Sequence, residues 1–233
     1  MSKYRQNLGE HATPPLSADV SPEGAAAMIQ RASASALNPG DHPANRSDAL
    51  SVVAQIAAKH AEQPGVADQA FSTLEKVVTD PAAGATVGMK ATALRVMPEL
   101  TGDKPELAKK GVAAVEKAIE EPGLQWEASK SLCRFAKQHP DKVGADVLRI
   151  AKDNSAKPEV SKNSDGQLSV AAYFIGANAS DPKLVDGSRR TLLAIAQQDG
   201  PHAAAAEQQA QGVAHVQARQ QQDSKRGLSA AAP

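Results

Sequence analysis

Apolar residues recur along most of the chain with the period of an α-helix. In several segments they fall at positions i, i+4, i+7 and i+8, a spacing that places them on one face of a helix. No segment alternates apolar and polar residues as a half-buried strand does. The pattern therefore predicts an all-α protein with about ten helices, at residues 22–37, 47–61, 65–79, 84–101, 105–121, 125–138, 141–154, 166–178, 182–198 and 201–221.

Four prolines, Pro64, Pro105, Pro140 and Pro182, divide this pattern into repeats. They lie 41, 35 and 42 residues apart. Proline is favoured at the first position of a helix and disfavoured inside one, so each is expected to separate two helices. The repeating unit is therefore predicted to be a helix A, a short turn that contains the proline, and a helix B.

The segments after the four prolines share one template of apolar and small residues. Its offsets are the same after Pro64, Pro105 and Pro182, and three residues shorter after Pro140. Because the template has helical spacing, we expect it to form the buried face of each helix B. Its members are Ala70, Leu74, Val77 and Val78; Gly111, Val115, Ala118 and Ile119; Val143, Val147, Ile150 and Ala151; and Ser188, Leu192, Ile195 and Ala196.

The ends of the chain differ from the repeats. Residues 1–20 lack periodicity and are expected to be disordered, and residues 222–233 are expected to form a flexible tail. Residues 21–221 are predicted to form one α-helical repeat domain. Its parts are repeats at about 47–80, 84–121, 125–154 and 166–198, loops at 38–46 and 155–165, and a cap helix rich in alanine and glutamine at 201–221. Ser21, Ser47-Asp48 and Asp181 are the predicted helix caps.

The four helix pairs resemble HEAT repeats, with the armadillo type left open. Pro98 matches the kinking proline of HEAT helix A, Asp103 and Asp181 match an Asp in the turn, and Lys109 and Arg189 match a basic residue in helix B. The other turns lack the Asp. The resemblance implies a right-handed α-solenoid of about four antiparallel helix pairs with flanking helices. Such folds serve scaffolds, transport receptors and some enzymes, so the fold alone does not give the function.

Composition narrows the classes of protein. Only 3% of residues are aromatic, so alanine, valine and leucine have to form the core. The 26 basic and 26 acidic residues cancel, whereas nucleic-acid binders usually carry a basic surplus, so a nucleic-acid partner is not expected. No apolar run is long enough for a membrane span, and Met1–Leu16 lacks the apolar core of a cleaved signal peptide. A cytoplasmic protein is the first expectation.

The sequence has few features that indicate catalysis, nucleotide binding or metal binding. The sequence has no nucleotide-binding glycine motif, and its six histidines are not spaced as metal ligands on one helix face. His60 and His139 are expected to lie at helix ends, where a cation complements the dipole. Cys133 lies on an apolar stripe and is predicted to be buried and unreactive. We therefore expect no catalytic residue, no metal and no cofactor.

Seven residues are candidates for contact with a partner. Trp126, the only tryptophan, belongs to a residue type that is common at binding hot spots, but a chain with few large side chains favours a role in the core. Tyr173 and Phe174 are also expected in the core. The other candidates are basic residues of the B helices, where interleaved acids favour a mixed, solvated surface over an anion site: Lys109, Lys110, Lys142, Arg149, Arg189 and Arg190.

The leading hypothesis for function is a non-catalytic protein-binding module or scaffold. A second hypothesis is a bacterial effector, because a polar N-terminus, abundant Ala, Gln and Ser and few aromatic residues resemble effectors that type III systems secrete into host cells without a cleaved signal. A third is a HEAT-like DNA glycosylase, which would need a basic groove lined with aromatic residues around a catalytic Asp. The neutral charge and the few aromatic residues count against this third hypothesis.

Overall fold

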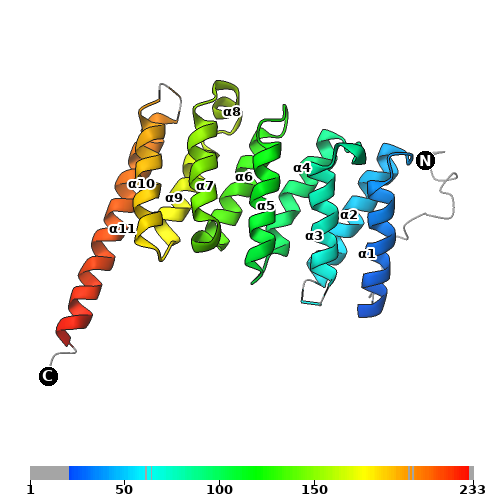
Figure 1. The fold of residues 1–233 in the computed structure, drawn as a ribbon, viewed down its shortest axis with the longest axis horizontal. Helices are drawn as coiled ribbons and strands as arrows, with labels where there is room; N and C mark the ends of the chain where they lie inside the picture. The colour runs from blue at the N-terminus through cyan, green and yellow to red at the C-terminus, as the bar shows by residue number, and fades with distance from the viewer. Residues whose placement is uncertain (1–20, 61, 64, 199, 201, 231–233) are drawn as a thin grey trace, which may run out of the picture. The chain divides into compact units, whose positions relative to one another are not determined.

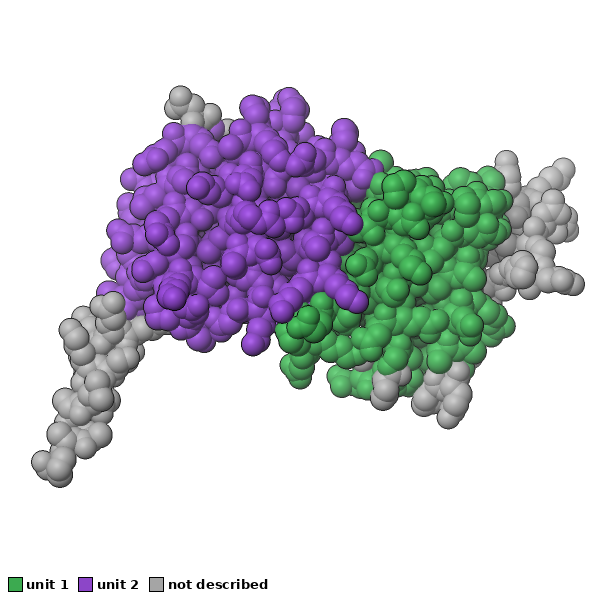
Figure 2. Space-filling view, viewed as in Figure 1, with its two compact units in different colours: residues 1–107 green, residues 108–233 purple. Residues whose placement is uncertain are grey.

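The fold is all-α. A computed structural model describes residues 21–60, 62–63, 65–198, 200 and 202–230, and these form eleven α-helices, two short 3-10 helices and no strand (Figure 1). The chain divides into two compact units, residues 1–107 and 108–233 (Figure 2). The α-helices are α1 (Pro22–Leu37), α2 (Pro43–Lys59), α3 (Val66–Thr79), α4 (Val87–Val96), α5 (Pro105–Ala118), α6 (Gln125–Gln138), α7 (Pro140–Ser155), α8 (Pro158–Asn163), α9 (Gln167–Asn178), α10 (Pro182–Ala196) and α11 (Ala203–Ala230).

Prolines start several of these helices, as the sequence predicted. Pro105, Pro140 and Pro182 are the first residues of α5, α7 and α10, whereas Pro64 lies outside the described residues. The predicted caps at Ser21 and Asp181 are confirmed, because their side chains accept hydrogen bonds from backbone N–H groups of the first helical turn. Fixed proline dihedrals and polar caps together explain why these starts can be read from sequence.

Helix α2 begins earlier than predicted. The expected cap at Ser47-Asp48 is wrong: the helix starts at Pro43, and His42 Nδ1 accepts a hydrogen bond from the N–H of Ala44 at 3.2 Å. The predicted loop at 38–46 is correspondingly shorter. The physical rule is the same one that places the other helix starts, since Pro43 occupies the first turn.

Three further segments differ from the prediction. The expected loop at 155–165 contains the short helix α8, and α11 continues to Ala230 rather than ending near 221. The predicted helix 84–101 is divided: α4 ends at Val96, and a 3-10 helix, η3 (Met97–Leu100), contains Pro98. A second 3-10 helix, η2 (Pro81–Ala83), precedes α4. Proline removes one N–H donor and clashes with the preceding turn, which explains the change at Pro98.

In the first unit, helices pack as successive pairs. α1 contacts α2 and α3, and α4 contacts α2 and α3, so α1 and α3 form one layer and α2 and α4 the other. Arg46 of α2 is buried between these elements, and no described carboxylate pairs with it. Its guanidinium donates hydrogen bonds to the carbonyl oxygens of Ala36 (3.2 Å), Gly84 (3.0 Å) and Ala83. One side chain thus satisfies carbonyl groups at the ends of α1 and η2 that no helix bond satisfies.

The second unit has the same two layers. α7 contacts α10 in one layer, α6 contacts α9 and α9 contacts α11 in the other, and α8 lies against α6 and α7. Figure 1 shows α7 and α10 in front of α6 and α9. The core uses the predicted template: all its members are buried except Ala196, which is half-buried. Small residues in this template allow helices to approach closely.

At three helical glycines of this unit, side chains of neighbouring helices fill the space that a Cβ atom would occupy. A Cβ atom on Gly111 would lie 2.2 Å from Cζ of Phe135, so the ring of α6 occupies the space beside α5. A Cβ on Gly144 would lie 2.9 Å from Leu184, and one on Gly176 would lie 2.4 Å from Ser188. These distances are shorter than any normal contact. A larger residue at any of these positions would therefore force the neighbouring side chain to move, and the cost is expected to be highest at Gly111, because Phe135 is fully buried.

Candidate functional site

The basic residues that the sequence proposed as contacts are exposed on α5, α7 and α10 of the second unit. Acidic side chains lie among them, as the alternation along each helix predicted. Arg149 illustrates the result: its Nη2 lies 2.9 Å from Oε2 of Glu116 and 3.5 Å from Oδ1 of Asp146. The six residues are Lys109 and Lys110 on α5, Lys142 and Arg149 on α7, and Arg189 and Arg190 on α10.

The pairing of Arg149 with Glu116 shifts the pKa of both side chains. The hydrogen bond from the guanidinium holds the pKa of the Glu116 carboxyl below its ordinary value, and the carboxylate raises the pKa of Arg149. Lys157 likewise pairs with Glu120 at the end of the same layer. Two cations on this side of the second unit, Arg149 and Lys157, are therefore paired with acids of the protein itself.

Trp126 lies on the other layer, in the first turn of α6. The expectation of a core position is wrong, since 43% of the residue is exposed. The Nζ atom of Lys130, one helical turn later, lies 4.3 Å from the centroid of its ring. An ammonium over the face of an indole is a favourable cation–π contact. The side chain of Lys130 therefore supports the exposed ring from its own helix.

A second contact of the same kind lies toward the other end of α6. Nζ of Lys137 is 5.9 Å from the ring centroid of Phe174 on α9. The ring of Tyr173 is 6.2 Å from that of Phe174, with the planes at 49°. Tyr173 and Phe174 were expected in the core, but both are half-buried at the surface of α9. The layer of α6 and α9 thus has two cation–π contacts at its surface, Lys130 with Trp126 and Lys137 with Phe174.

These five residues, Trp126, Lys130, Lys137, Tyr173 and Phe174, define a surface that we call the α6–α9 face. Its composition is uneven in charge. α9, with the sequence QLSVAAYFIGAN, has no charged residue, and the one acid of α6, Glu127, is only 8% exposed. Arg134 is half-exposed on the same side of α6. The α6–α9 face therefore combines one exposed and two half-buried aromatic rings with positive charge.

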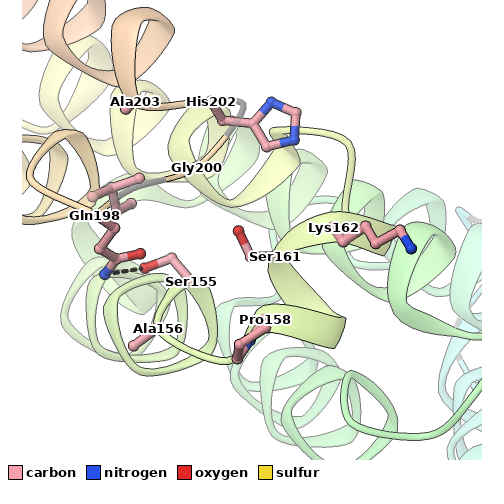
Figure 3. Close-up of a pocket in the computed structure, with 10 residues that line it drawn as sticks. Ser155, Ala156, Pro158, Ser161, Lys162, Gln198, Gly200, His202 and Ala203 are labelled. Carbon is pink, nitrogen blue, oxygen red and sulfur yellow. Dashed lines mark hydrogen bonds between the residues drawn. The ribbon is translucent and has the colours of Figure 1, made fainter.

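A pocket of about 410 Å³ lies elsewhere in the second unit, between the ends of α7, α8, α10 and α11 (Figure 3). Ser155 Oγ accepts a hydrogen bond from Nε2 of Gln198 at 3.3 Å and donates one to the carbonyl of Lys152 at 2.9 Å. In Figure 3 the side chains of Lys162 and His202 lie at the rim. None of its described lining residues is an acid, and the Ser155 hydroxyl already donates to a backbone carbonyl.

Cys133 is also unsuited to nucleophilic chemistry. It is buried, as predicted, and its Sγ donates to the carbonyl oxygen of Gln167 at 3.0 Å. Burial away from water disfavours the thiolate and raises the pKa of the thiol to about 12. At neutral pH the side chain therefore links α6 to the start of α9 as a neutral thiol.

The remaining candidates for chemistry lie at helix ends. His60 and His139 cap the C-termini of α2 and α6, which confirms the positions predicted for them. Within the described part of the chain, no group of three or more His, Cys, Asp or Glu side chains is arranged to hold a metal ion. Of the helices in that part, none combines the length and the apolar character that crossing a membrane requires.

No protein-family model, curated protein or solved structure matches this chain. The strongest functional feature among the described residues is the α6–α9 face. Sequence reasoning singled out Trp126 but missed its two lysines. Their signal was present in the helical spacing, because Lys130 and Lys137 lie four and eleven residues after Trp126 and so share its side of α6.

Proposed function

We propose that this chain is a non-catalytic protein-binding module, built as a right-handed α-solenoid of HEAT-like helix pairs. The repeat architecture is supported by side-chain contacts that join residues 33 to 40 positions apart, close to the spacing of the prolines: Arg149 with Glu116, Cys133 with Gln167, Lys104 with Asp68, and Thr73 with Ser33. In a solenoid each repeat contacts its neighbours, so such a constant separation is expected.

The observation that carries the binding function is the exposure of Trp126. A chain with 3% aromatic residues has few large side chains for its core, yet it leaves its only tryptophan 43% exposed. Burying an indole on a partner removes a large apolar area from water, which is why tryptophan dominates binding hot spots. Lys130 holds the ring over α6 and reduces the freedom that binding would remove.

Site-specific photo-crosslinking tests this function. A benzophenone amino acid is placed at Ala177, on the half-buried outer side of α9, or at Ala113, which is exposed on α5 in the other layer. In cells that express the chain, position 177 is expected to yield a discrete protein adduct and position 113 is not. Trp126→Ala should reduce the adduct at 177 at least tenfold, because the ring supplies much of the contact area.

Two results would count against a protein-binding function. One is equal adducts from positions 113 and 177 that Trp126→Ala does not change. The other is an adduct at 177 that nuclease removes, which would point to nucleic acid. Circular dichroism of each variant checks that the helices remain folded, so that a lost adduct reports lost binding.

A further inference from the structure

We infer that the α6–α9 face binds an acidic amphipathic segment of a partner protein, an inference that rests on the proposed function. The segment would cover the rings of Trp126 and Phe174 with apolar side chains and place carboxylates beside Lys130 and Lys137. Both lysines lie on rings, and neither has a carboxylate partner among the described residues. The binding surface is thus prepared for negative charge as well as for apolar contact.

The charges on α6 and α9 themselves support an acidic partner. α9 carries no charge and the acid of α6 is buried, so the lysines of the face are not balanced from their own helices. The neighbouring α8 contributes exposed Glu159 and Lys162, whose charges cancel, and two more exposed acids lie near α9: Asp165 before its start and Glu207 in the second turn of α11. Complementary charge raises the rate of encounter and rejects partners of the wrong sign.

The spacing of the two lysines suggests the form of the segment. Lys130 and Lys137 are seven residues apart on α6, which is about 10 Å along the helix axis. A partner helix with acids seven residues apart presents carboxylates at the same interval, with apolar residues on the turns between them. Trp126 and Lys137 are about 16 Å apart by the same rise. A segment of about three helical turns therefore spans the α6–α9 face.

A single-stranded nucleic acid fits the α6–α9 face less well. Proteins that bind single strands offer ring faces for bases to stack on, in a groove that follows the phosphates. Here Lys130 already occupies a face of the Trp126 ring. The chain as a whole also has no net positive charge. A peptide can cover the ring edges and pair with the ammonium groups, so it requires neither a free ring face nor a positive net charge of the chain.

Peptide titrations test the charge preference, with the emission of Trp126 as the signal. The probes are synthetic amphipathic helices of about three turns without tryptophan, which carry leucine on one side and Glu, Gln or Lys at positions flanking it. The Glu peptide is expected to bind at least tenfold more tightly than the Gln peptide, and the Lys peptide not to bind. Added salt should narrow the difference between Glu and Gln peptides.

Charge-reversal variants locate the site. Lys130→Glu with Lys137→Glu should weaken the Glu peptide at least tenfold and give measurable binding of the Lys peptide. The matched control is Lys110→Glu with Lys142→Glu, which changes the same charge on exposed positions of α5 and α7. This control should bind the Glu peptide within twofold of the unmodified protein. Gain of binding to the Lys peptide cannot come from unfolding.

The outcomes separate this inference from the proposed function. Equal affinity for Glu and Gln peptides, with no effect of the Lys130 and Lys137 reversals, would overturn the acidic partner while crosslinking at 177 would still support protein binding. No response to any peptide and no protein adduct would overturn both. Tighter binding of an oligothymidylate than of the Glu peptide, lost in the same double variant, would replace the peptide by a nucleic acid.

Discussion

The packing of α5 on α6 depends on the absence of a side chain at Gly111. The ring of Phe135 fills the place that a side chain at position 111 would occupy, and Phe135 is fully buried. Gly111→Ala is therefore expected to lower the free energy of unfolding by about 1–3 kcal/mol, because an overpacked core has to shift its side chains. Urea denaturation followed by circular dichroism measures the change.

Gly88→Ala is the matched control for this substitution. Gly88 is exposed in α4, and an added Cβ would meet nothing nearer than Oγ1 of Thr86, at 3.9 Å. Alanine there should leave stability unchanged or raise it by up to about 1 kcal/mol, because alanine favours the helix. If both substitutions gave the same shift in urea midpoint, the contact between Gly111 and Phe135 would not limit packing.

Arg46 should tolerate no substitution, including lysine. Its planar guanidinium reaches three backbone carbonyls at once, and a lysine ammonium cannot match that geometry. We expect Arg46→Lys to cost about 2 kcal/mol or more, since buried carbonyls would lose charged donors. Arg31→Lys, at an exposed position on α1, should change the unfolding free energy by less than about 0.5 kcal/mol. Similar losses at both positions would refute a specific role for Arg46.

At the level of single residues, the sequence predicts burial better than it predicts contact. The template identified Gly111 as a core position, but nothing in a single sequence pairs it with Phe135, which lies on another helix. The prediction that Trp126 is buried rested on its size, because large apolar side chains are usually buried, and it was wrong. Helical periodicity held the correct signal, because Trp126 lies opposite the buried stripe of Ala128 and Leu132 on α6.

At the level of elements, the pair formed by Arg149 of α7 and Glu116 makes one helix–helix interface sensitive to pH. Its arginine holds the pKa of Glu116 below the ordinary value. A carboxyl with a lowered pKa stabilises the fold at pH values above its unfolded pKa, and this contribution disappears as the pH falls through its folded pKa. Arg149→Met should therefore cost roughly 0.2–1 kcal/mol at neutral pH, as exposed pairs do.

The cost of Arg149→Met should decrease at about pH 3 and in about 1 M NaCl, because protonation and screening each weaken the pair in the unmodified protein. Thermal unfolding of both proteins over this pH range measures it. Lys142→Met on the same helix serves as the control, with a small effect that does not follow the titration of a carboxyl. A constant difference between pH 7 and pH 3 would contradict the role of Glu116.

Two helices that begin with proline after a capping side chain, α1 and α10, start at the predicted residues, whereas α2 begins in the same way but starts at Pro43 rather than at residue 47. α1 and α6 have the predicted bounds, and α10 starts at the predicted residue. α8 was missed because its six residues are too few for a periodic pattern and are rich in turn-forming types. The end of α11 was missed because a polar sequence gives no apolar stripe to follow.

At the level of the molecule, we expect the two units to lose stability separately. Leu50 and Leu132 are fully buried in the first and second unit, respectively. Either change to alanine should cost about 2–5 kcal/mol of local stability. Hydrogen exchange should show lost protection in α1 to α4 for Leu50→Ala and in α6, α9 and α10 for Leu132→Ala. Uniform loss along the chain in both variants would instead indicate one cooperative block.

The sequence could not predict this division into units. Repeat periodicity is continuous across residues 105–121, and a solenoid pattern predicts similar contacts between all neighbouring pairs. The boundary after Leu107 falls inside α5, one turn from its start, where neither composition nor a linker marks it. The candidate site was likewise only half predictable, because the α6–α9 face joins residues of two helices that only the fold brings together.

The three glycines beside bulky neighbours make each joint of the second unit different from the next. Gly111 accommodates an aromatic ring, Gly144 a leucine, and Gly176 a hydroxyl and a branched chain. A helix moved to another position in this unit would place a different side chain against each of these glycines. These helix interfaces are therefore not interchangeable, and duplication of one helix pair of this unit would require new substitutions at the added interface.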